Sequence, residues 1–504
     1  MKDHFDIVII GSGMGGLVCG DILSREGYRV CILEKNKQIG GCLQTFVRDK
    51  VIFDAGVHYI GGLAPGQTLY QVFKYLGLMD QLKLERMNDE AFDTIIMSGD
   101  KKEYSFAQGY NRFVQNLVKD FPDDEKAIRT YCDKIKEVCG RFPMYNLRTG
   151  GQYSEKEEVL TIDTKSFIDG LTENKKLRAV LAGNNILYAG QPDKTPFYVH
   201  ALILNSYIES AWKCVDGGSQ IAKLIAKNIR RRGGFIKNHS EVKRIVDENG
   251  KISHVELADQ SKIYAAQFIS DMHPAKTMEI TDSLLIKNAY RNRIKNLENS
   301  ISSFSVNIVF KKNTFRYVNQ NYYYHKEGHI WNMDDYTQEN WPLGYAVFFP
   351  ASSAAKEFAE GMTIFTYMKY EEVAKWENTF NTVSEKVERG ETYDTFKKKK
   401  ADKLLQLVEE KFPGLQNSIK TYYTSTPLSY RDYIGSDDGS MYGIVKDYKD
   451  PIKTIIAART KLPNLYLTGQ NLNLHGILGS TISSLVTCAA LLGSEDFVNK
   501  IKEA

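Results

Sequence analysis

The sequence lacks the features that mark disulfide-rich, membrane-spanning and nucleic-acid-binding proteins. Its seven cysteines form no C-x-x-C pair and have no regular spacing, which argues against a disulfide framework or a metal site and for a reducing compartment. No apolar run approaches the roughly 18 residues that a spanning helix needs. A net charge of +4 over 504 residues points to no polyanionic partner. We therefore expect a cytoplasmic protein that binds no nucleic acid and no metal.

Length and charge patterning add three expectations. A chain of 504 residues is too long for one core and should form two or three domains. The first apolar run begins so near the N-terminus that we expect no signal peptide. Two predicted helices, at 220–232 and 397–412, carry basic faces. Solvated faces are the commoner explanation, and a peripheral contact with a membrane stays open as the alternative.

A glycine-rich stretch near the start carries the strongest signal. Residues 7–10 are an apolar run that predicts a buried parallel strand, and Gly11, Gly13 and Gly16 follow with G-x-G-x-x-G spacing. Such glycines let the chain turn tightly and let backbone N–H groups approach a pyrophosphate at a helix N-terminus. Glu34 ends the next predicted strand, where a carboxylate would bind the two ribose hydroxyls. Because Glu34 indicates an unphosphorylated ribose, the ligand is FAD or NAD.

A second block of sequence distinguishes between FAD and NAD as the ligand. Residues 40–46 read GGCLQTF, and residues 53–62 read FDAGVHYIGG, the first part of which predicts a short strand at 53–59. Together with the glycine fingerprint, these stretches resemble the flavoprotein family of phytoene desaturases and carotenoid isomerases, and within it the retinol saturase branch. Many members carry arginine after the paired glycines, whereas Cys42 stands here and favours that branch. The resemblance implies FAD as the cofactor.

The resemblance also implies the architecture. It predicts an α/β fold in which a Rossmann-like FAD-binding domain, of the glutathione reductase type 2 or amine oxidase kind, is interleaved with an α+β substrate domain built on a mixed sheet. The FAD-binding domain would comprise 1–75, 213–285 and 455–504. The substrate domain would comprise 76–212 and 286–454.

Periodicity in the middle of the chain agrees with such a division. Helical spacing of apolar residues at 68–76 and 113–121 predicts two amphipathic helices. Three strands with a turn at Asn249-Gly250 predict a β-meander over 242–270, and alternating residues over 301–370 predict the sheet of a second domain. The resemblance places the backbone of Val242 against the adenine.

The C-terminal end supplies the rest of the predicted flavin site. A buried strand at 465–467, a turn at Gly469 and small residues expected to open a helix at 479–481 form another site suited to negative charge. By resemblance, the first glycine block, the paired glycines and this end together hold FAD. The predicted cofactor-binding residues are Gly11, Gly13, Met14, Gly15, Gly16, Glu34, Lys35, Gly40, Gly41, Cys42, Thr45, Val242, Gly469, Gln470, Asn471, Gly479, Ser480 and Thr481.

The chemistry expected of this arrangement is saturation of a carbon–carbon double bond in a hydrophobic conjugated substrate, such as a retinoid or carotenoid, by hydride transfer from flavin N5. The neighbouring carbon needs a proton donor, and the candidates are His58, His200, Tyr207 and His475, each of which has a structural role as its alternative. Desaturation or cis–trans isomerisation at the same site is the first rival. A non-enzymatic isoprenoid carrier is the second. With no second glycine fingerprint, NAD(P)H docking transiently or a redox partner protein would supply the electrons.

Overall fold

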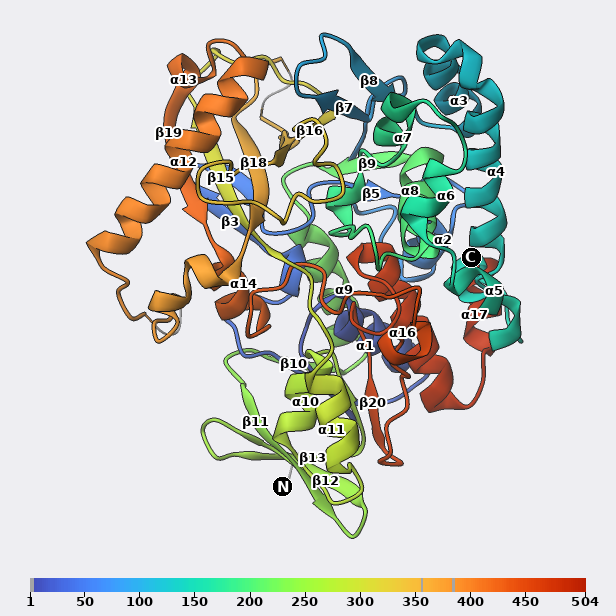
Figure 1. Ribbon diagram of the computed structural model, residues 1–504. Coiled ribbons are helices and arrows are strands. Elements are labelled where there is room, and N and C mark those ends of the chain that lie inside the picture. Colours follow the sequence, from blue (N-terminus) through green and yellow to red (C-terminus); the bar gives the residue numbers. More distant parts are fainter. Residues whose placement is uncertain (1–3, 355–356, 383–385) are drawn as a thin grey trace.

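The computed structural model describes residues 4–354, 357–382 and 386–504, and two large β-sheets organise it (Figure 1). The first sheet has the order β10-β2-β1-β13-β12-β11-β14, and β20 also pairs with β13. Its strands are β1 (His4–Ile10), β2 (Val30–Leu33), β10 (Phe235–Lys237), β11 (Val242–Glu248), β12 (Lys251–Leu257), β13 (Lys262–Ser270), β14 (Thr281–Asp282) and β20 (Leu465–Leu467).

Strand β1 lies at the centre of this sheet and runs parallel to both of its neighbours, β2 and β13. Its side chains alternate between two apolar clusters. Ile7 and Ile9 pack with α1 (Met14–Arg25), α9 (Ser219–Arg231) and α16 (Gly476–Leu492), whereas Val8 and Ile10 pack with residues of β11, β12 and the helix α10 (Pro274–Ile280). A strand covered on both faces requires a continuous apolar run, so the predicted parallel strand is confirmed.

The second sheet has the order β19-β15-β18-β17-β16-β7-β8. Its pairs are antiparallel except β16 with β7, so the predicted mixed sheet is confirmed. Helix α12 (Glu391–Lys411) covers one face, where Leu404 and Val408 join the cluster of Phe304 and Ile308. The strands are β7 (Asp93–Met97), β8 (Glu103–Phe106), β15 (Ser302–Phe310), β16 (Asn321–His325), β17 (Gly344–Phe348), β18 (Gly361–Met368) and β19 (Ile419–Ser425).

The other face of this sheet meets a group of helices that includes α4 and α8 (Figure 1). The apolar stripes predicted at 68–76 and 113–121 are confirmed as the buried faces of α2 and α3.

No helix within the described ranges is long and apolar enough to cross a bilayer. The principal remaining helices are α2 (Thr68–Tyr75), α3 (Tyr110–Asp120), α4 (Glu125–Gly140), α7 (Lys175–Leu181), α8 (Phe197–Glu209), α11 (Asn288–Lys295), α14 (Pro427–Ile434) and α17 (Asp496–Lys502).

Two local predictions are wrong. Of the strand expected at 53–59, only the first two residues are in a strand: β4 (Val51–Asp54), which pairs with β3 (Thr45–Arg48), ends at Asp54. Residues 55–59 form a loop, and β5 (Ile60–Gly61), which pairs with β9 (Ala211–Cys214), begins after it. The loop between β4 and β5 carries His58. Helix α16 begins at Gly476 rather than at 479, so the backbone N–H groups of Ser480 and Thr481 lie beyond the four that are free at a helix start.

Candidate active site

Glycines from three separate segments meet at the N-terminus of α1. Gly11 follows β1 with a φ of +99°, a conformation that side chains with a Cβ rarely adopt. A Cβ atom on Gly13 would lie 2.6 Å from the carboxylate of Asp271, and one on Gly15 would lie 2.7 Å from the Cα atom of Gly469. Glycine is therefore required here because backbone and carboxylate approach too closely for any side chain.

The Asp271 carboxylate lies where an anionic ligand of this helix would lie. Its own backbone N–H donates to the carbonyl of Ile10 at 2.8 Å, which fixes the residue beside the end of β1. Its carboxylate accepts hydrogen bonds from the backbone N–H groups of Gly16 and Gly13. Burial raises the pKa of Asp271 to about 7, and the nearby charge of Glu34 raises it further against these donors. We call Gly11, Gly13, Gly15, Gly16 and Gly469 the glycine cradle. It fits the pyrophosphate of FAD because its backbone N–H groups at the helix N-terminus already bind the oxygens of one carboxyl group.

The raised pKa of Asp271 predicts a pH-dependent stability of the flavin-free protein. A carboxyl whose folded pKa lies above its unfolded value of 3.8 stabilises the fold most at low pH, and this stability is lost as the pH rises towards 7. We expect Asp271→Asn to remove that loss, worth about 1–4 kcal/mol. Urea unfolding of the flavin-free wild type and Asp271→Asn between pH 4 and 8 measures the difference between the two curves. Parallel curves would show that the pKa of Asp271 is ordinary.

Glu34, the predicted ribose-binding acid, is buried within a loop network. Its Oε2 accepts hydrogen bonds from the Ser12 hydroxyl at 2.5 Å and from the Ser12 backbone N–H at 3.1 Å, while Oε1 accepts from the backbone N–H of Asn36 at 2.8 Å. Its carbonyl accepts from the backbone N–H of Ser240 at 2.8 Å. This bond brings the start of β11, with Val242, beside the same loop. The acid and the predicted adenine strand are therefore neighbours.

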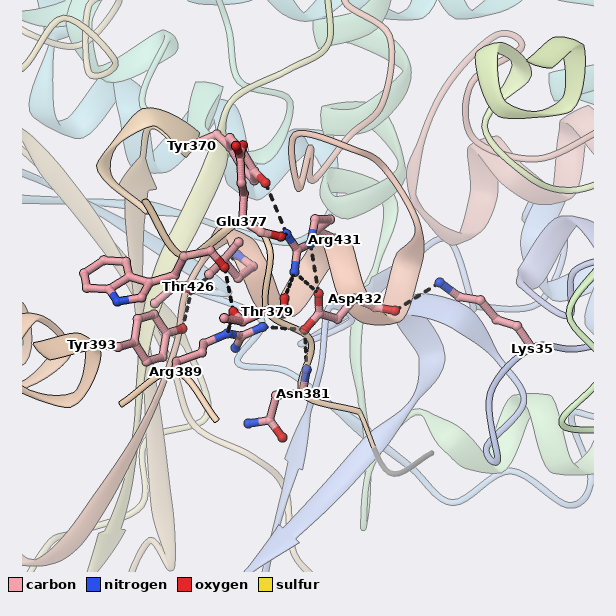
Figure 2. Close-up of polar contacts among 12 residues, drawn as sticks. Lys35, Tyr370, Glu377, Thr379, Asn381, Arg389, Tyr393, Thr426, Arg431 and Asp432 are labelled. Carbon is pink, nitrogen blue, oxygen red and sulfur yellow. Dashed lines mark hydrogen bonds and ion pairs between the residues drawn. The ribbon is translucent and has the colours of Figure 1, made fainter. Parts of the chain in front are cut away.

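Lys35 and Asn36 connect this loop to α14. The ammonium of Lys35 donates to the carbonyl of Asp432 at 3.0 Å (Figure 2). The Asn36 amide donates to the carbonyl of Tyr433 at 2.9 Å. Burial lowers the pKa of Lys35. The structure thus assigns the predicted cofactor residue Lys35 a contact with a helix C-terminus, where a cation is favourable.

The side chain of Asp432 holds α14 in place through two buried arginines (Figure 2). Its Oδ2 accepts from Arg389 at 2.5 Å and from the backbone N–H of Asn381 at 2.9 Å, and its Oδ1 accepts from Arg431 at 2.7 Å. The carboxylate is fully buried, and the arginines are 6% and 10% exposed. This cluster connects the segment before α12 to the helix that Lys35 contacts, and the sequence analysis did not anticipate it.

The paired glycines continue the cradle towards the flavin end. Gly40 and Gly41 both have positive φ values, of +113° and +54°, and a Cβ atom on Gly41 would lie 3.1 Å from the Cα atom of Gly13. Burial raises the pKa of the Cys42 thiol to about 11, so this cysteine stays protonated at neutral pH. Thr45 donates its hydroxyl hydrogen bond to Ser219, at 3.0 Å.

At the C-terminal block, the structure separates residues that the sequence analysis grouped together. Gly469 adjoins Asp271, with Gln470 next along the chain. The Asn471 side-chain oxygen accepts a hydrogen bond from the backbone N–H of Ile444 at 3.1 Å, so it already has a partner. The Thr481 hydroxyl bonds back to the carbonyl of Ile477 at 2.7 Å. Such back-bonding within a helix leaves Thr481 without a free donor for a ring.

A cavity of about 120 Å³ lies next to the start of α16 and contains three of the four predicted catalytic residues. His58, Tyr207 and His475 line it, and so do Gly479 and Phe348. The His58 ring stacks on Phe348 with centroids 4.3 Å apart, and His475 donates from Nε2 to the carbonyl of Leu187 at 2.9 Å. Burial lowers the pKa of both histidines to about 4, so both are neutral at pH 7.

His200, the fourth candidate, is not among the residues that line the cavity. It is fully buried in α8, and its two ring nitrogens bond to the hydroxyls of Tyr131 at 2.6 Å and Tyr188 at 2.8 Å. Burial lowers the pKa of His200 to about 3. Both nitrogens are satisfied by core tyrosines, so this histidine has the contacts of a structural residue.

Similarity to known proteins agrees with this geometry. Residues 9–76 match the family model of an NAD(P)-binding Rossmann-like domain. The chain is 27% identical to the all-trans-retinol 13,14-reductase of Danio rerio, over 98% of this chain and 86% of that protein. It is 26% identical to the chloroplastic prolycopene isomerase of Daucus carota, over 87% of this chain and 72% of that protein.

A solved structure of a putrescine oxidase double mutant, from a redesign of cofactor binding, has a TM-score of 0.65 at 12% identity, covering 98% of this chain and all of that one. This likeness confirms the predicted fold class. These findings confirm the predicted resemblance to the retinol saturase and carotenoid isomerase branch, and the chain is a flavin-dependent oxidoreductase.

Proposed function

We propose that the protein saturates one carbon–carbon double bond of a hydrophobic conjugated polyene, with FAD as its cofactor. The retinol reductase named above acts on such a molecule, and the carotenoid isomerase shows that a related chain acts on longer polyenes. When bound, reduced FAD supplies a hydride from N5, and the protein must hold the polyene against it and exclude water.

The main observation behind this proposal is a pair of adjoining cavities with largely apolar linings. The inner cavity shares the lining residues Leu202, Leu474, Leu478 and Gly479 with an outer cavity of about 670 Å³. Aromatic and aliphatic side chains dominate both linings, which suits a long apolar chain better than a small polar substrate. The shared residues lie at the predicted flavin end, so a polyene entering through the outer space would reach the ring.

The electron source and the location form part of the proposal. NAD(P)H docking transiently, or a redox partner protein, would reduce the flavin. We place the protein in the cytoplasm, with peripheral contact to a membrane as the route by which an apolar substrate arrives. The basic side chains Arg148 and Lys156 line the outer cavity and would favour an anionic membrane surface.

An anaerobic half-reaction tests the proposal. The purified protein is reduced, all-trans-retinol or a short polyene ketone is added, and the absorbances of the flavin and the polyene are followed. We expect the flavin to reoxidise while the polyene loses conjugation, and a fully saturated analogue to leave the flavin reduced. A flavin that stays reduced with every polyene would contradict saturation and favour desaturation or isomerisation. A colourless protein that binds isoprenoid chains would favour the carrier.

A further inference from the structure

A buried carboxyl lies behind the wall of the inner cavity. Tyr59 lines this cavity and donates its hydroxyl hydrogen bond to Asp93 Oδ2 at 2.9 Å, and its oxygen lies 2.8 Å from the hydroxyl of Tyr323. We propose that Tyr59 donates the proton that the reduction requires and that Asp93 restores the proton to Tyr59; this inference rests on the saturation proposed above. Neither residue was predicted from the sequence.

Three segments far apart in the chain build this group. Asp93 begins β7, Tyr323 lies in the adjacent strand β16, and Tyr59 directly precedes β5. The ring of Tyr59 stacks on that of Tyr207, another cavity residue, with centroids 4.2 Å apart, and the ring of Phe348 lies 6.1 Å away. These contacts fix the phenol at the cavity wall.

The surroundings of Asp93 suit a carboxyl that gains and loses a proton. It is fully buried, and the amides of Asn184 and Asn321 donate to it at 2.6 Å and 2.9 Å. Burial raises its pKa to about 7 against these hydrogen bonds and that of Tyr59. A carboxyl of this kind is half protonated near neutral pH, which is the condition for efficient proton transfer.

The charged and titratable groups around Asp93 are few. Besides the three tyrosines at 59, 207 and 323, Lys213 acts on it, and the positive charge of this lysine favours the ionised carboxylate. Lys213 is itself fully buried, and its Nζ has no hydrogen-bond partner in the part of the chain that the structure describes. Burial lowers its pKa to about 7.

The histidines of the same cavity are less suited to this role. His58 and His475 are neutral at pH 7, and the Nε2–H group of His475 is already donated to a backbone carbonyl. A neutral imidazole is a poor acid, because losing its remaining proton leaves an anion. The hydrogen-bonded pair of Tyr59 and Asp93 instead ends in a carboxyl group that carries an exchangeable proton.

The transfer balances without a further reactant. When Asp93 is protonated, it donates to the Tyr59 oxygen, and Tyr59 no longer has to donate its own proton to Asp93. The hydride adds to one carbon of the double bond, carrying both electrons. The Tyr59 O–H bond breaks and a C–H bond forms at the neighbouring carbon. The Asp93 proton re-forms the Tyr59 hydroxyl, and the resulting carboxylate takes a proton from solvent before the next turnover.

The half-reaction of the flavin-loaded protein, measured with all-trans-retinol between pH 5.5 and 9, tests the proposal. We expect Tyr59→Phe and Asp93→Asn to slow flavin reoxidation by roughly 10²-fold or more, the usual contribution of a positioned acid. The wild-type rate should fall as the pH rises through about 7, and Asp93→Asn should lack this fall. Reoxidation by ferricyanide, which needs no proton donor, should stay unchanged in both variants, showing that the flavin is bound and active.

The matched control is Tyr104→Phe, which removes another tyrosine–carboxylate bond, to Asp100 at 2.8 Å, outside the cavity. It should keep the wild-type rate. An infrared difference spectrum between wild type and Asp93→Asn should show a protonated carboxyl band that disappears near pH 7. If the wild type reacts and both variants reoxidise the flavin within threefold of its rate, or if no such band appears, the proton relay from Asp93 through Tyr59 is wrong while the proposed function stands. A wild-type flavin that no polyene reoxidises would overturn the proposed function and the relay with it.

Discussion

Asp432→Ala is expected to lower the free energy of unfolding of the flavin-loaded protein by about 3–5 kcal/mol, because it leaves two buried arginines without their counterion. The carboxylate is fully buried and binds Arg389 and Arg431 together with the backbone N–H of Asn381. The C-terminal end of α14, which Lys35 contacts, would lose its anchor. Chemical denaturation, followed by intrinsic fluorescence and by release of flavin fluorescence, measures both effects.

Asp282→Ala is the matched control. It removes an aspartate that binds Arg244 at 2.8 Å, but both side chains are more than half exposed. An exposed pair of this kind contributes about 0–1 kcal/mol, so the control should unfold close to the wild type. Equal unfolding midpoints for Asp432→Ala and Asp282→Ala would show that the buried cluster does not stabilise this part of the fold.

Gly15→Ala should weaken the binding of FAD. The added methyl group would lie 2.7 Å from the Cα atom and 2.8 Å from the nitrogen of Gly469, and it would overlap the Asp271 carboxylate. Backbone atoms on both sides cannot yield as the end of a flexible side chain can. Overpacking costs about 1–3 kcal/mol, which corresponds to roughly a fivefold to 150-fold loss of affinity if the whole cost falls on binding. The ratio of flavin to protein after purification, and titration of the flavin-free protein with FAD, measure it.

Gly140→Ala serves as the control for that substitution. Gly140 ends α4, and a Cβ atom there would meet nothing within 4 Å. The variant should retain flavin as the wild type does. If Gly15→Ala also purifies with a full complement of flavin, the glycine cradle is not where the cofactor binds.

Local patterns predicted the local elements well. The apolar run at 7–10 and the positive φ of Gly11 depend on neighbouring residues only, so their spacing in the sequence was sufficient. Predictions failed where segments far apart in the sequence decide how the strands pair. Residues 53–59 were expected to form one strand, but β4 ends at Asp54 and pairs with β3, whereas β5 begins at Ile60 and pairs with β9. Residues 55–59 are therefore a loop between two different sheets. Strand β7 was not predicted, although one of its partners, β8, follows it closely in the chain; its other partner, β16, lies more than 200 residues further along.

The sequence by itself determined the class of this protein, because the glycine fingerprint, Glu34 and the C-terminal block are short patterns whose chemistry needs only local geometry. Tertiary structure alone decided which side chains meet. Asp271 reaches the glycine cradle because β13 pairs with β1, and Asp93 reaches Tyr59 because β7 joins the second sheet. Such proximities, and the pKa values that burial then sets, depend on long-range strand pairing, which no single stretch of sequence encodes.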